Sequence, residues 1–185
     1  LDPMATGVLP IFLGRATKAC DLVPEQKKRY LATFRLGITT DTQDITGQIL
    51  RQEQAACSPE QVRTVLARFV GQQQQVPPMY SAVKVDGKRL YDLARQGKEV
   101  QRQSREITIF ALELLDQNPD AGEYTIDVTC SKGTYIRTLC HDVGQALGCG
   151  ATLTQLRRTL SAGFSLEQCI TLEEASRLAG EGRLS

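Results

Sequence analysis

The opening segment of the chain carries a carboxylate in a position suited to chemistry. Asp2 lies between Leu1 and Pro3, in a stretch rich in Gly, Pro and Thr. Loops of this composition often present functional side chains. Asp is also common in turns, where its side chain stabilises the backbone. The local sequence therefore leaves two roles open for Asp2, catalysis and turn formation.

A second candidate segment, residues 130–137, joins an alternating strand to a helix through Gly133. Such junctions often bind anions or present side chains at a cleft. Arg137 lies just inside the helix, where a guanidinium can pair with a carboxylate or a phosphate in bidentate geometry. A solvent-exposed arginine is the alternative, and position alone does not decide between them.

Basic residues recur beside aromatic ones along the chain. The groups are Lys27-Lys28-Arg29-Tyr30, Tyr80 with Lys84, Lys88-Arg89 with Tyr91, and the pair Arg157-Arg158. Phosphate contacts combined with stacking platforms are what the recognition of looped RNA requires. These residues form either a one-sided nucleic-acid patch on a neutral protein or ordinary solvated faces.

The only histidine, His141, stands between Cys140 and Asp142. Adjacent residues on a helix point in different directions, and no second histidine completes a common zinc set. The six cysteines lack the close paired spacing of zinc sites and the density of a disulfide scaffold. We expect no metal and no cysteine nucleophile, and we interpret the cysteines as reduced thiols of a cytosolic protein.

Length and composition limit the class of protein that the chain can form. The chain has 185 residues, 41% of them hydrophobic and 23% charged, and a formal charge of +1. These are globular values, and no apolar run approaches the roughly 20 residues of a membrane span. We therefore expect a soluble protein, and nucleic-acid binding would have to come from local rather than net charge.

Periodicity predicts an alternation of short strands and helices. Strands are expected over 30–36, 83–87, 105–115, 124–130 and 151–158, the second ending in an Asp-Gly turn. Helices are expected from the Ser58 cap to Gly71, around 90–94, over 135–147, and from the Thr171 cap through Leu178. Residues 39–47 are expected to form a loop. The pattern favours one α+β domain with a mixed, mainly antiparallel sheet flanked by helices.

Several separated segments, in the same order, resemble the tRNA pseudouridine-55 synthases of the TruB type. The opening Leu1-Asp2-Pro3-Met4-Ala5-Thr6-Gly7, continuing to Lys18, is similar to the catalytic motif of that family. Further matches are Lys28-Arg29-Tyr30, the stretch 37–47, the stretch 78–97, residues 130–137, and Leu156-Arg157-Arg158. The resemblance covers nearly the whole chain and implies the pseudouridine synthase catalytic fold over residues 1–185.

The resemblance implies specific roles for these residues. Asp2 would be the catalytic nucleophile, acting at the ribose C1′ or at the base, and Arg137 would hold it ionised and oriented. Tyr30 would stack on the flipped uridine and take part in proton transfer. Tyr135 and Leu156 would pack around the uracil, and Lys18 would give structural or RNA support.

The same resemblance implies the substrate and the partners. The substrate would be the uridine at position 55 in the T-arm stem-loop of tRNA, which must be flipped out before it reacts. No cofactor, metal or membrane is implied, and we expect a cytoplasmic monomer. Relative to the family, an upstream strand and a C-terminal RNA-binding extension are not found in these residues, so we expect a catalytic domain truncated at the N-terminus.

Two other functions compete with this interpretation. One is a noncatalytic RNA-binding or tRNA-folding module on the same scaffold, which would not need Asp2, Tyr30 and Arg137 together. The other is an unrelated small-molecule enzyme, for which the sequence offers neither a nucleotide-cradling glycine motif nor a metal set.

Overall fold

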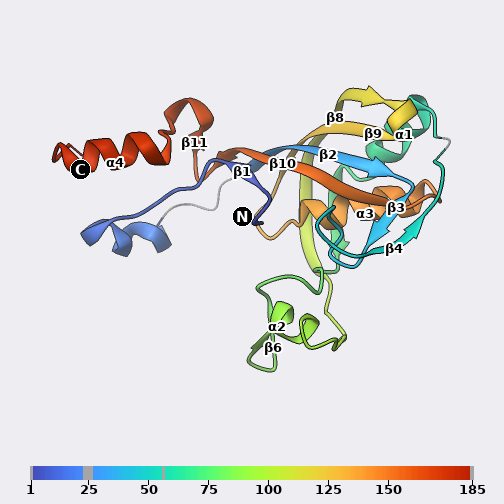
Figure 1. The fold of residues 1–185 in the computed structure, drawn as a ribbon, viewed down its shortest axis with the longest axis horizontal. Coiled ribbons are helices and arrows are strands. Elements are labelled where there is room, and N and C mark those ends of the chain that lie inside the picture. The colour runs from blue at the N-terminus through green and yellow to red at the C-terminus, as the bar shows by residue number, and fades with distance from the viewer. Residues whose placement is uncertain (1, 23–26, 56, 184–185) are drawn as a thin grey trace.

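The structure is a computed structural model that describes residues 2–22, 27–55 and 57–183. Its main element is a seven-stranded sheet in the order β1-β10-β2-β9-β8-β5, with β11 added to β10 (Figure 1). The strands are β1 (Thr6–Gly7), β2 (Lys28–Leu36), β5 (Gly71–Gln75), β8 (Arg105–Asn118), β9 (Glu123–Cys130), β10 (Ala151–Ser161) and β11 (Phe164–Ser165). Among these strands, β1 runs parallel to β10 and the other pairings are antiparallel. The predicted mixed, mainly antiparallel α+β fold is confirmed.

The alternation of residues along the central strand β2 gives the sheet its buried face. Its alternate residues Tyr30, Ala32, Phe34 and Leu36 are all buried, as the period of two in the sequence predicts. The strand pairs with β10 on one side and β9 on the other, so that Tyr30 faces Arg158 and Val128 in the two registers. Tyr30, a candidate site residue from the sequence, is therefore held by strand pairing on both sides.

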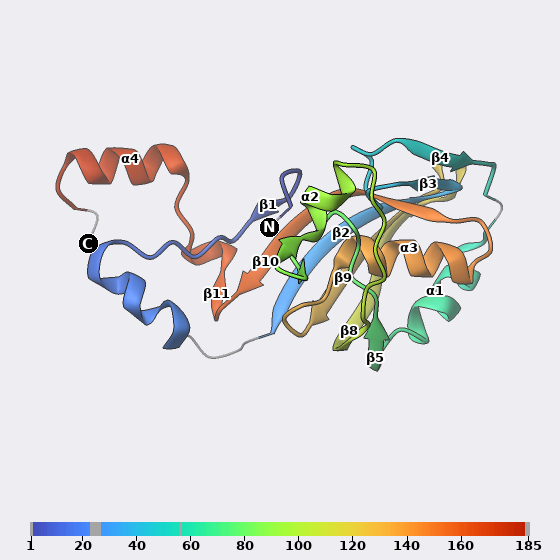
Figure 2. The same ribbon diagram turned by 90° about the horizontal axis from the view of Figure 1, so that it is seen from below.

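Two helices cover the buried face of the sheet (Figure 2). Helix α1 (Pro59–Ala67) has the predicted capping box, in which Ser58 and Gln61 satisfy each other's backbone amides. Helix α3 (Ile136–Ala146) follows Tyr135 and packs on β10 and β2. The prediction that the first helix reaches Gly71 is wrong: it ends at Ala67, and Gly71, at φ +110°, opens strand β5 against β8.

A small lobe projects from the sheet between β5 and β8. It contains the two-stranded ribbon β6 (Lys84–Val85) and β7 (Lys88–Arg89) and helix α2 (Leu90–Ala94). The predicted Asp-Gly turn is confirmed, with φ of +50° at Asp86 and +80° at Gly87. A second ribbon pairs β3 (Ile38–Thr40) with β4 (Ile49–Gln52), so Thr39 and Thr40 are in a strand and not in the expected loop.

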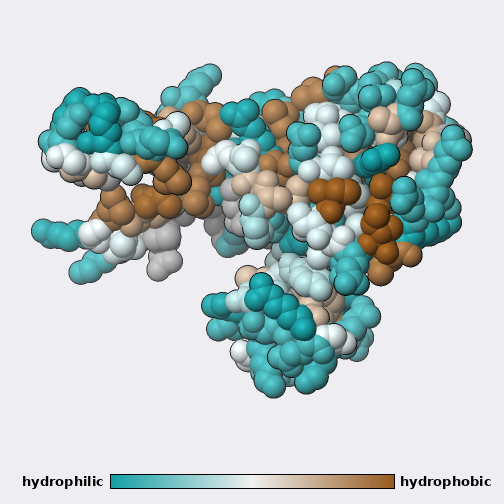
Figure 3. Space-filling model, viewed as in Figure 1, coloured by the Kyte–Doolittle hydropathy of each residue, from teal (hydrophilic) through white to brown (hydrophobic). Residues whose placement is uncertain are grey.

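Two segments, one that follows β1 and one that follows β11, extend from the same end of the sheet. The N-terminal segment carries the 3-10 helix η1 (Gly14–Leu22), and the C-terminal segment carries η3 (Leu166–Gln168) and α4 (Leu172–Gly180), while η2 (Pro119–Ala121) lies in the β8–β9 turn. Exposed apolar side chains lie on both extensions (Figure 3), among them Leu9, Ile11, Leu13, Phe164, Ile170 and Leu172. Within the described residues, no helix is both long and apolar enough to span a membrane.

Candidate active site

A cleft of about 760 Å³ lies where the N-terminal segment, the sheet, α3 and the small lobe meet. Five of the six residues proposed from the sequence line it: Asp2, Tyr30, Tyr135, Arg137 and Leu156. They come from widely separated parts of the chain, from Asp2 near its start to Leu156 on β10. Lys18 does not line this cleft and lies on η1, so its supporting role stays a prediction.

Strand β1 places Asp2 at the cleft. Thr6 and Gly7 pair with Arg157 and Arg158 of β10, and Val8 N donates to the Arg158 carbonyl at 2.9 Å. Gly7 is required at this contact, because it has φ +100° and an added Cβ would lie 2.1 Å from the Arg158 carbonyl oxygen. The carboxylate four residues before β1 is thereby held over the sheet.

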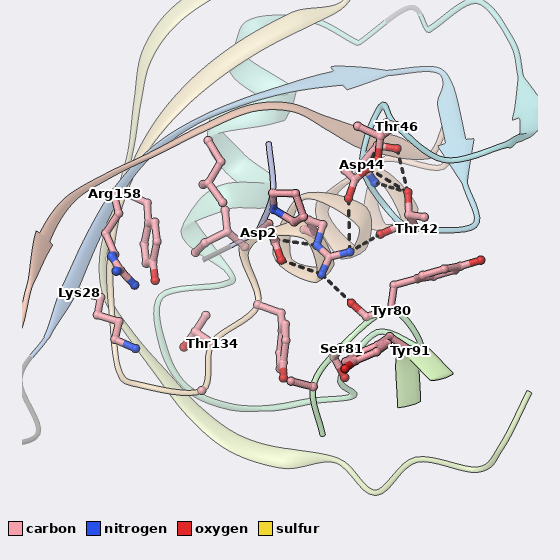
Figure 4. A pocket seen from close by; sticks show the side chains of 18 of the residues that line it. Asp2, Lys28, Thr42, Asp44, Thr46, Tyr80, Ser81, Tyr91, Thr134 and Arg158 are labelled. Atoms are coloured by element: carbon pink, nitrogen blue, oxygen red, sulfur yellow. Dashed lines mark hydrogen bonds and ion pairs between the residues drawn. The ribbon is translucent and has the colours of Figure 1, made fainter. Parts of the chain in front are cut away.

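Asp2 and Arg137 form a two-point ion pair (Figure 4). Arg137 Nη2 donates to Asp2 Oδ1 at 3.0 Å, and Arg137 Nε lies 2.9 Å from Oδ2. The second contact is an ion-pair contact without hydrogen-bond alignment. The turn that begins at Asp2 uses its backbone carbonyl, which accepts from Ala5 N at 2.9 Å. The side chain is therefore engaged by Arg137, and turn formation does not account for it.

Arg137 is buried, with 5% of its side chain exposed, which rules out the solvent-exposed alternative. Its Nη2 also donates to the Tyr80 carbonyl at 2.8 Å, and its Nη1 donates to the Thr42 carbonyl at 2.9 Å. The guanidinium thus contacts three parts of the chain besides its own helix. Because Arg is charged at every physiological pH, it supplies a permanent positive charge behind Asp2.

Asp44 is a second carboxylate on the same guanidinium, and the sequence analysis missed it. Its Oδ2 lies 3.3 Å from Arg137 Nη1, and its side chain is 7% exposed. Its Oδ1 accepts from Thr42 Oγ1 at 3.0 Å and from Thr46 N at 3.0 Å. Asp44 is therefore a fully partnered buried carboxylate, while Asp2, at 30% exposure, remains accessible from the cleft.

Tyr30 lies in the cleft at the end of the buried face of β2, 7% exposed. Burial raises the pKa of its phenol, and the positive charge of Arg158 acts in the opposite direction. The raised pKa keeps the hydroxyl protonated at neutral pH. The residue can therefore offer both an aromatic face and a proton donor.

The small lobe closes one side of the cleft. Tyr80, Ser81, Tyr91 and Arg95 line it from this lobe, and the Arg95 guanidinium lies 5.4 Å from the centre of the Tyr91 ring. The contact between Arg137 and the Tyr80 carbonyl attaches the lobe to the site. Aromatic and basic side chains beside one another match the pattern seen in the sequence.

The Cys140-His141-Asp142 trio is not part of the cleft. Cys140 is completely buried, and burial raises its thiol pKa far above the usual range. No group of three or more potential metal ligands is found among the described residues. The described cysteines 57, 130, 140, 149 and 169 are free thiols, with Cys57 and Cys149 Sγ atoms 3.7 Å apart.

Other cleft residues also escaped the sequence analysis as site residues. Lys28 and Arg158 line the cleft from β2 and β10. Both belong to segments already noticed for their charge. For Lys28 the available signal was its position two residues before Tyr30, on the same face of the strand, whereas Arg158 is placed by the strand register opposite Tyr30. Asp44 gave no local signal, because its burial depends on contacts with β10.

Comparison with solved structures identifies the class of fold. A Cbf5-Nop10-Gar1 complex contains a chain that superposes with a TM-score of 0.72 at 28% identity, covering 100% of this chain and 46% of that one. A structure of an H/ACA RNP bound to a substrate RNA containing 2′-deoxyuridine gives a TM-score of 0.69 at 24% identity, covering 100% and 45%. The fold is that of the pseudouridine synthases.

The family is defined by the sequence matches. Residues 1–136 match the N-terminal domain of the TruB family pseudouridylate synthases, and residues 137–181 match the C-terminal domain of tRNA pseudouridylate synthase B. The chain belongs to the TruB family of pseudouridylate synthases. The resemblance inferred from the motifs is confirmed.

Curated relatives are similar over almost the whole of this chain. The tRNA pseudouridine synthase B of Alkaliphilus oremlandii is 49% identical over 96% of the chain, that of Syntrophomonas wolfei 53% over 94%, and that of Cupriavidus metallidurans 50% over 99%. The matched regions make up 59%, 58% and 58% of those relatives. The chain therefore spans somewhat more than half the length of the curated proteins that it matches.

Proposed function

We propose that this protein converts a uridine in tRNA to pseudouridine, and that the uridine is position 55 in the T-arm loop. The main observation in support is the Asp2–Arg137 ion pair, which holds a partly exposed carboxylate in the cleft that Tyr30 and Leu156 also line. Family membership and relatives named tRNA pseudouridine synthase B support the same activity. The proposal treats residues 1–185 as one catalytic unit, because β2 and β10, from the two matched regions, pair in one sheet.

The reaction sets clear demands on the site. The N1–C1′ glycosidic bond breaks, the detached uracil turns, and a C5–C1′ bond forms to the same sugar. C5 loses its proton and N1 gains one, so the product is an isomer of the substrate. A carboxylate suits this sequence, because it can trap or stabilise the electron-poor carbon and later leave.

Asp2 is the nucleophile in this proposal. Its attack on the ribose C1′ and its attack on the base are both compatible with its position. Arg137 orients it through the two-point contact and balances its charge. Because Arg137 is itself fixed by two backbone carbonyls and by Asp44, the carboxylate is held in place before the substrate arrives.

Tyr30, Tyr135 and Leu156 form the pocket for the base. The ring of Tyr30 offers a stacking surface, and its hydroxyl, protonated at neutral pH, is suited to proton transfer when C5 loses its hydrogen. A base inside an RNA loop must leave its stack to reach these side chains. Tyr30 and Leu156, which are 7% and 6% exposed, would give the base a largely apolar surrounding.

The partner that we propose is the tRNA T-arm stem-loop, bound by a monomer in the cytoplasm. The lobe with Tyr91 and Arg95 and the basic residues of β2 and β10 support an RNA-facing cleft. The proposed steps need no cofactor or metal. A noncatalytic tRNA-binding module is the second candidate, and the presence of Asp2, Tyr30 and Arg137 together in one cleft favours the enzyme.

The deciding experiment measures pseudouridine in an unmodified T-arm stem-loop RNA after incubation with the protein or its Asp2→Asn variant. We expect conversion by the protein, none by the variant, and similar RNA affinity for both, because Asn keeps the shape of Asp and loses its charge. Tight binding without conversion by the unaltered protein would favour the noncatalytic module. Unchanged turnover in the variant would remove Asp2 from the mechanism.

A further inference from the structure

Two cations lie at one end of the cleft, away from the Asp2–Arg137–Asp44 group. Lys28 is the first residue of β2, and Arg158 lies on the neighbouring strand β10. Figure 4 shows both on one side of Asp2, with Thr42, Asp44 and Thr46 on the other. The carboxylates of the cleft, Asp2 and Asp44, are both engaged with Arg137.

The strand register explains why Lys28 and Arg158 come together. Tyr30 and Arg158 are Cα partners across β2 and β10, and Lys28 is two residues before Tyr30 on the same face. Long side chains at such diagonal positions are within reach of each other. Lys28, Tyr30 and Arg158 all line the cleft.

The Lys28–Arg158 pair lacks an anionic partner in the described part of the chain. Neither side chain takes part in a salt bridge there. Burial lowers the pKa of the Lys28 ammonium, and the nearby charge of Arg158 lowers it further, with Cys130 acting in the opposite direction. Two like charges in a partly buried place repel each other, and an anion between them would relieve the repulsion.

Arg158 is fixed in this position. Its Nε donates to the Val8 carbonyl at 2.8 Å, and the residue is 7% exposed. The strand β1 that positions Asp2 is thus attached to the same arginine. The distance between the cationic end of the cleft and the nucleophile is therefore set by the sheet.

We infer that Lys28 and Arg158 form a binding site for a backbone phosphodiester next to the flipped nucleotide. This inference rests on the proposed function, because the phosphate enters as part of the RNA. With the base on Tyr30 and the sugar at Asp2, the phosphate attached to that sugar is the anion that the pair would bind. Holding it would draw the nucleotide out of its loop and fix C1′ against the carboxylate.

The test is a double-mutant cycle between Lys28 and the RNA backbone, measured in the Asp2→Asn background so that no turnover occurs. The RNA affinity of the Lys28→Gln variant is compared with that of the protein that keeps Lys28. Three T-arm stem-loops are used: one is unmodified, one carries an uncharged methylphosphonate on the 5′ side of the target uridine, and one carries it on the 3′ side. Since a charge-assisted contact is lost, we expect Lys28→Gln to weaken binding of the unmodified RNA about tenfold.

Coupling is the result that supports the site. One of the two methylphosphonates should weaken RNA binding by the protein that keeps Lys28 by a similar factor. The same methylphosphonate should leave RNA binding by the Lys28→Gln variant unchanged. Lys28→Gln should also reduce the slope of log affinity against log salt concentration by about 0.7, the value for one single-strand phosphate contact. Lys28→Arg, which keeps the charge, should retain most of the affinity and the slope.

Two outcomes would overturn the inference. One is unchanged RNA binding by Lys28→Gln. The other is that, at both methylphosphonate positions, the affinity losses caused by the protein change and by the RNA change are independent and simply multiply. The substitutions in the RNA leave the protein intact, so misfolding cannot produce the coupling. Conversion of the unmodified RNA by the protein is assayed separately. If the protein forms pseudouridine but Lys28 is not coupled to either phosphate, only the phosphate site is refuted. If Lys28 is coupled to a phosphate but no pseudouridine forms, only the proposed isomerase activity is refuted.

Discussion

Arg137 and Asp44 form an ion pair behind Asp2, with Nη1 3.3 Å from Oδ2 and both side chains almost completely buried. Asp2 contacts the other edge of the same guanidinium. One buried cation thus serves two carboxylates of different exposure. Asp44 accepts hydrogen bonds from its own loop and is suited to positioning, and Asp2 faces the cleft and is suited to reaction.

Replacing Asp44 should impair catalysis through Arg137. Asp44→Asn keeps an oxygen for Thr42 and Thr46 and removes the charge that fixes Arg137, so we expect the rate of isomerisation to fall roughly tenfold with little change in RNA affinity. Single-turnover rates and binding constants separate the two effects. Asp120→Asn, on the exposed η2 turn, is the matched control. A wild-type rate for Asp44→Asn would show that Arg137 needs no second carboxylate.

Replacing Tyr30 by Phe should separate stacking from proton transfer. The ring remains, so RNA binding is expected to survive, and the hydroxyl is lost, so the rate should fall by a factor of about 10²–10⁴ if it transfers a proton. Pseudouridine formation under single-turnover conditions measures the effect. If the rate is unchanged, the hydroxyl takes no part in the reaction.

Gly144 should tolerate no side chain. It lies against the start of β10, where an added Cβ would be 2.2 Å from the Ala151 backbone nitrogen. Gly144→Ala is therefore expected to destabilise the fold by about 1–3 kcal/mol and to lower the melting temperature by several degrees. Gly180→Ala in α4 is the control, because its Cβ would meet nothing within 4 Å and Ala favours the helix. Equal melting temperatures for the two variants would contradict the packing argument.

The partly buried carboxyl of Asp142 should make stability depend on pH. Burial raises its pKa from 3.8 to about 6, so the folded state holds this proton more tightly than the unfolded chain does. Its contribution to stability is full below about pH 4 and is lost as the pH rises through about 6. Asp142→Asn should remove this loss and stabilise the protein at pH 8 by about 1 kcal/mol, a value reduced for partial solvent screening. Urea unfolding at pH 4 and pH 8 tests this, and an equal free-energy difference between the two proteins at both pH values would refute it.

The sequence predicted those elements whose signals are local. The capping box at Ser58 and the alternation of β2 depend on residues a few positions apart, and both were found as expected. Gly71 was misinterpreted, because its role is decided by pairing with Ile109 on a strand far along the chain. The joint placement of Asp2, Tyr30 and Arg137 was available only through the family resemblance, since no periodicity relates residues so far apart.

Asp44 shows why part of the site could not be predicted. Its loop is positioned by the 2.8 Å hydrogen bond from Ile45 N to the Leu153 carbonyl and by a bridge between Asp44 and Leu153. These contacts span more than one hundred residues of sequence and bury a carboxylate in a stretch whose polar composition indicated an ordinary loop. The cation that makes this burial possible, Arg137, comes from a third segment.

The pairing of β1 with β10 also determines when the proposed active site can form. Asp2 is synthesised well before Arg157 and Arg158, the residues of β10 with which the strand that positions it pairs. Contacts between such distant segments form slowly in folding. Asp2 therefore reaches its place only after the last long strand of the sheet has docked, and a partly folded or nascent chain would lack the proposed active site. Gain of activity during refolding should coincide with completion of the sheet.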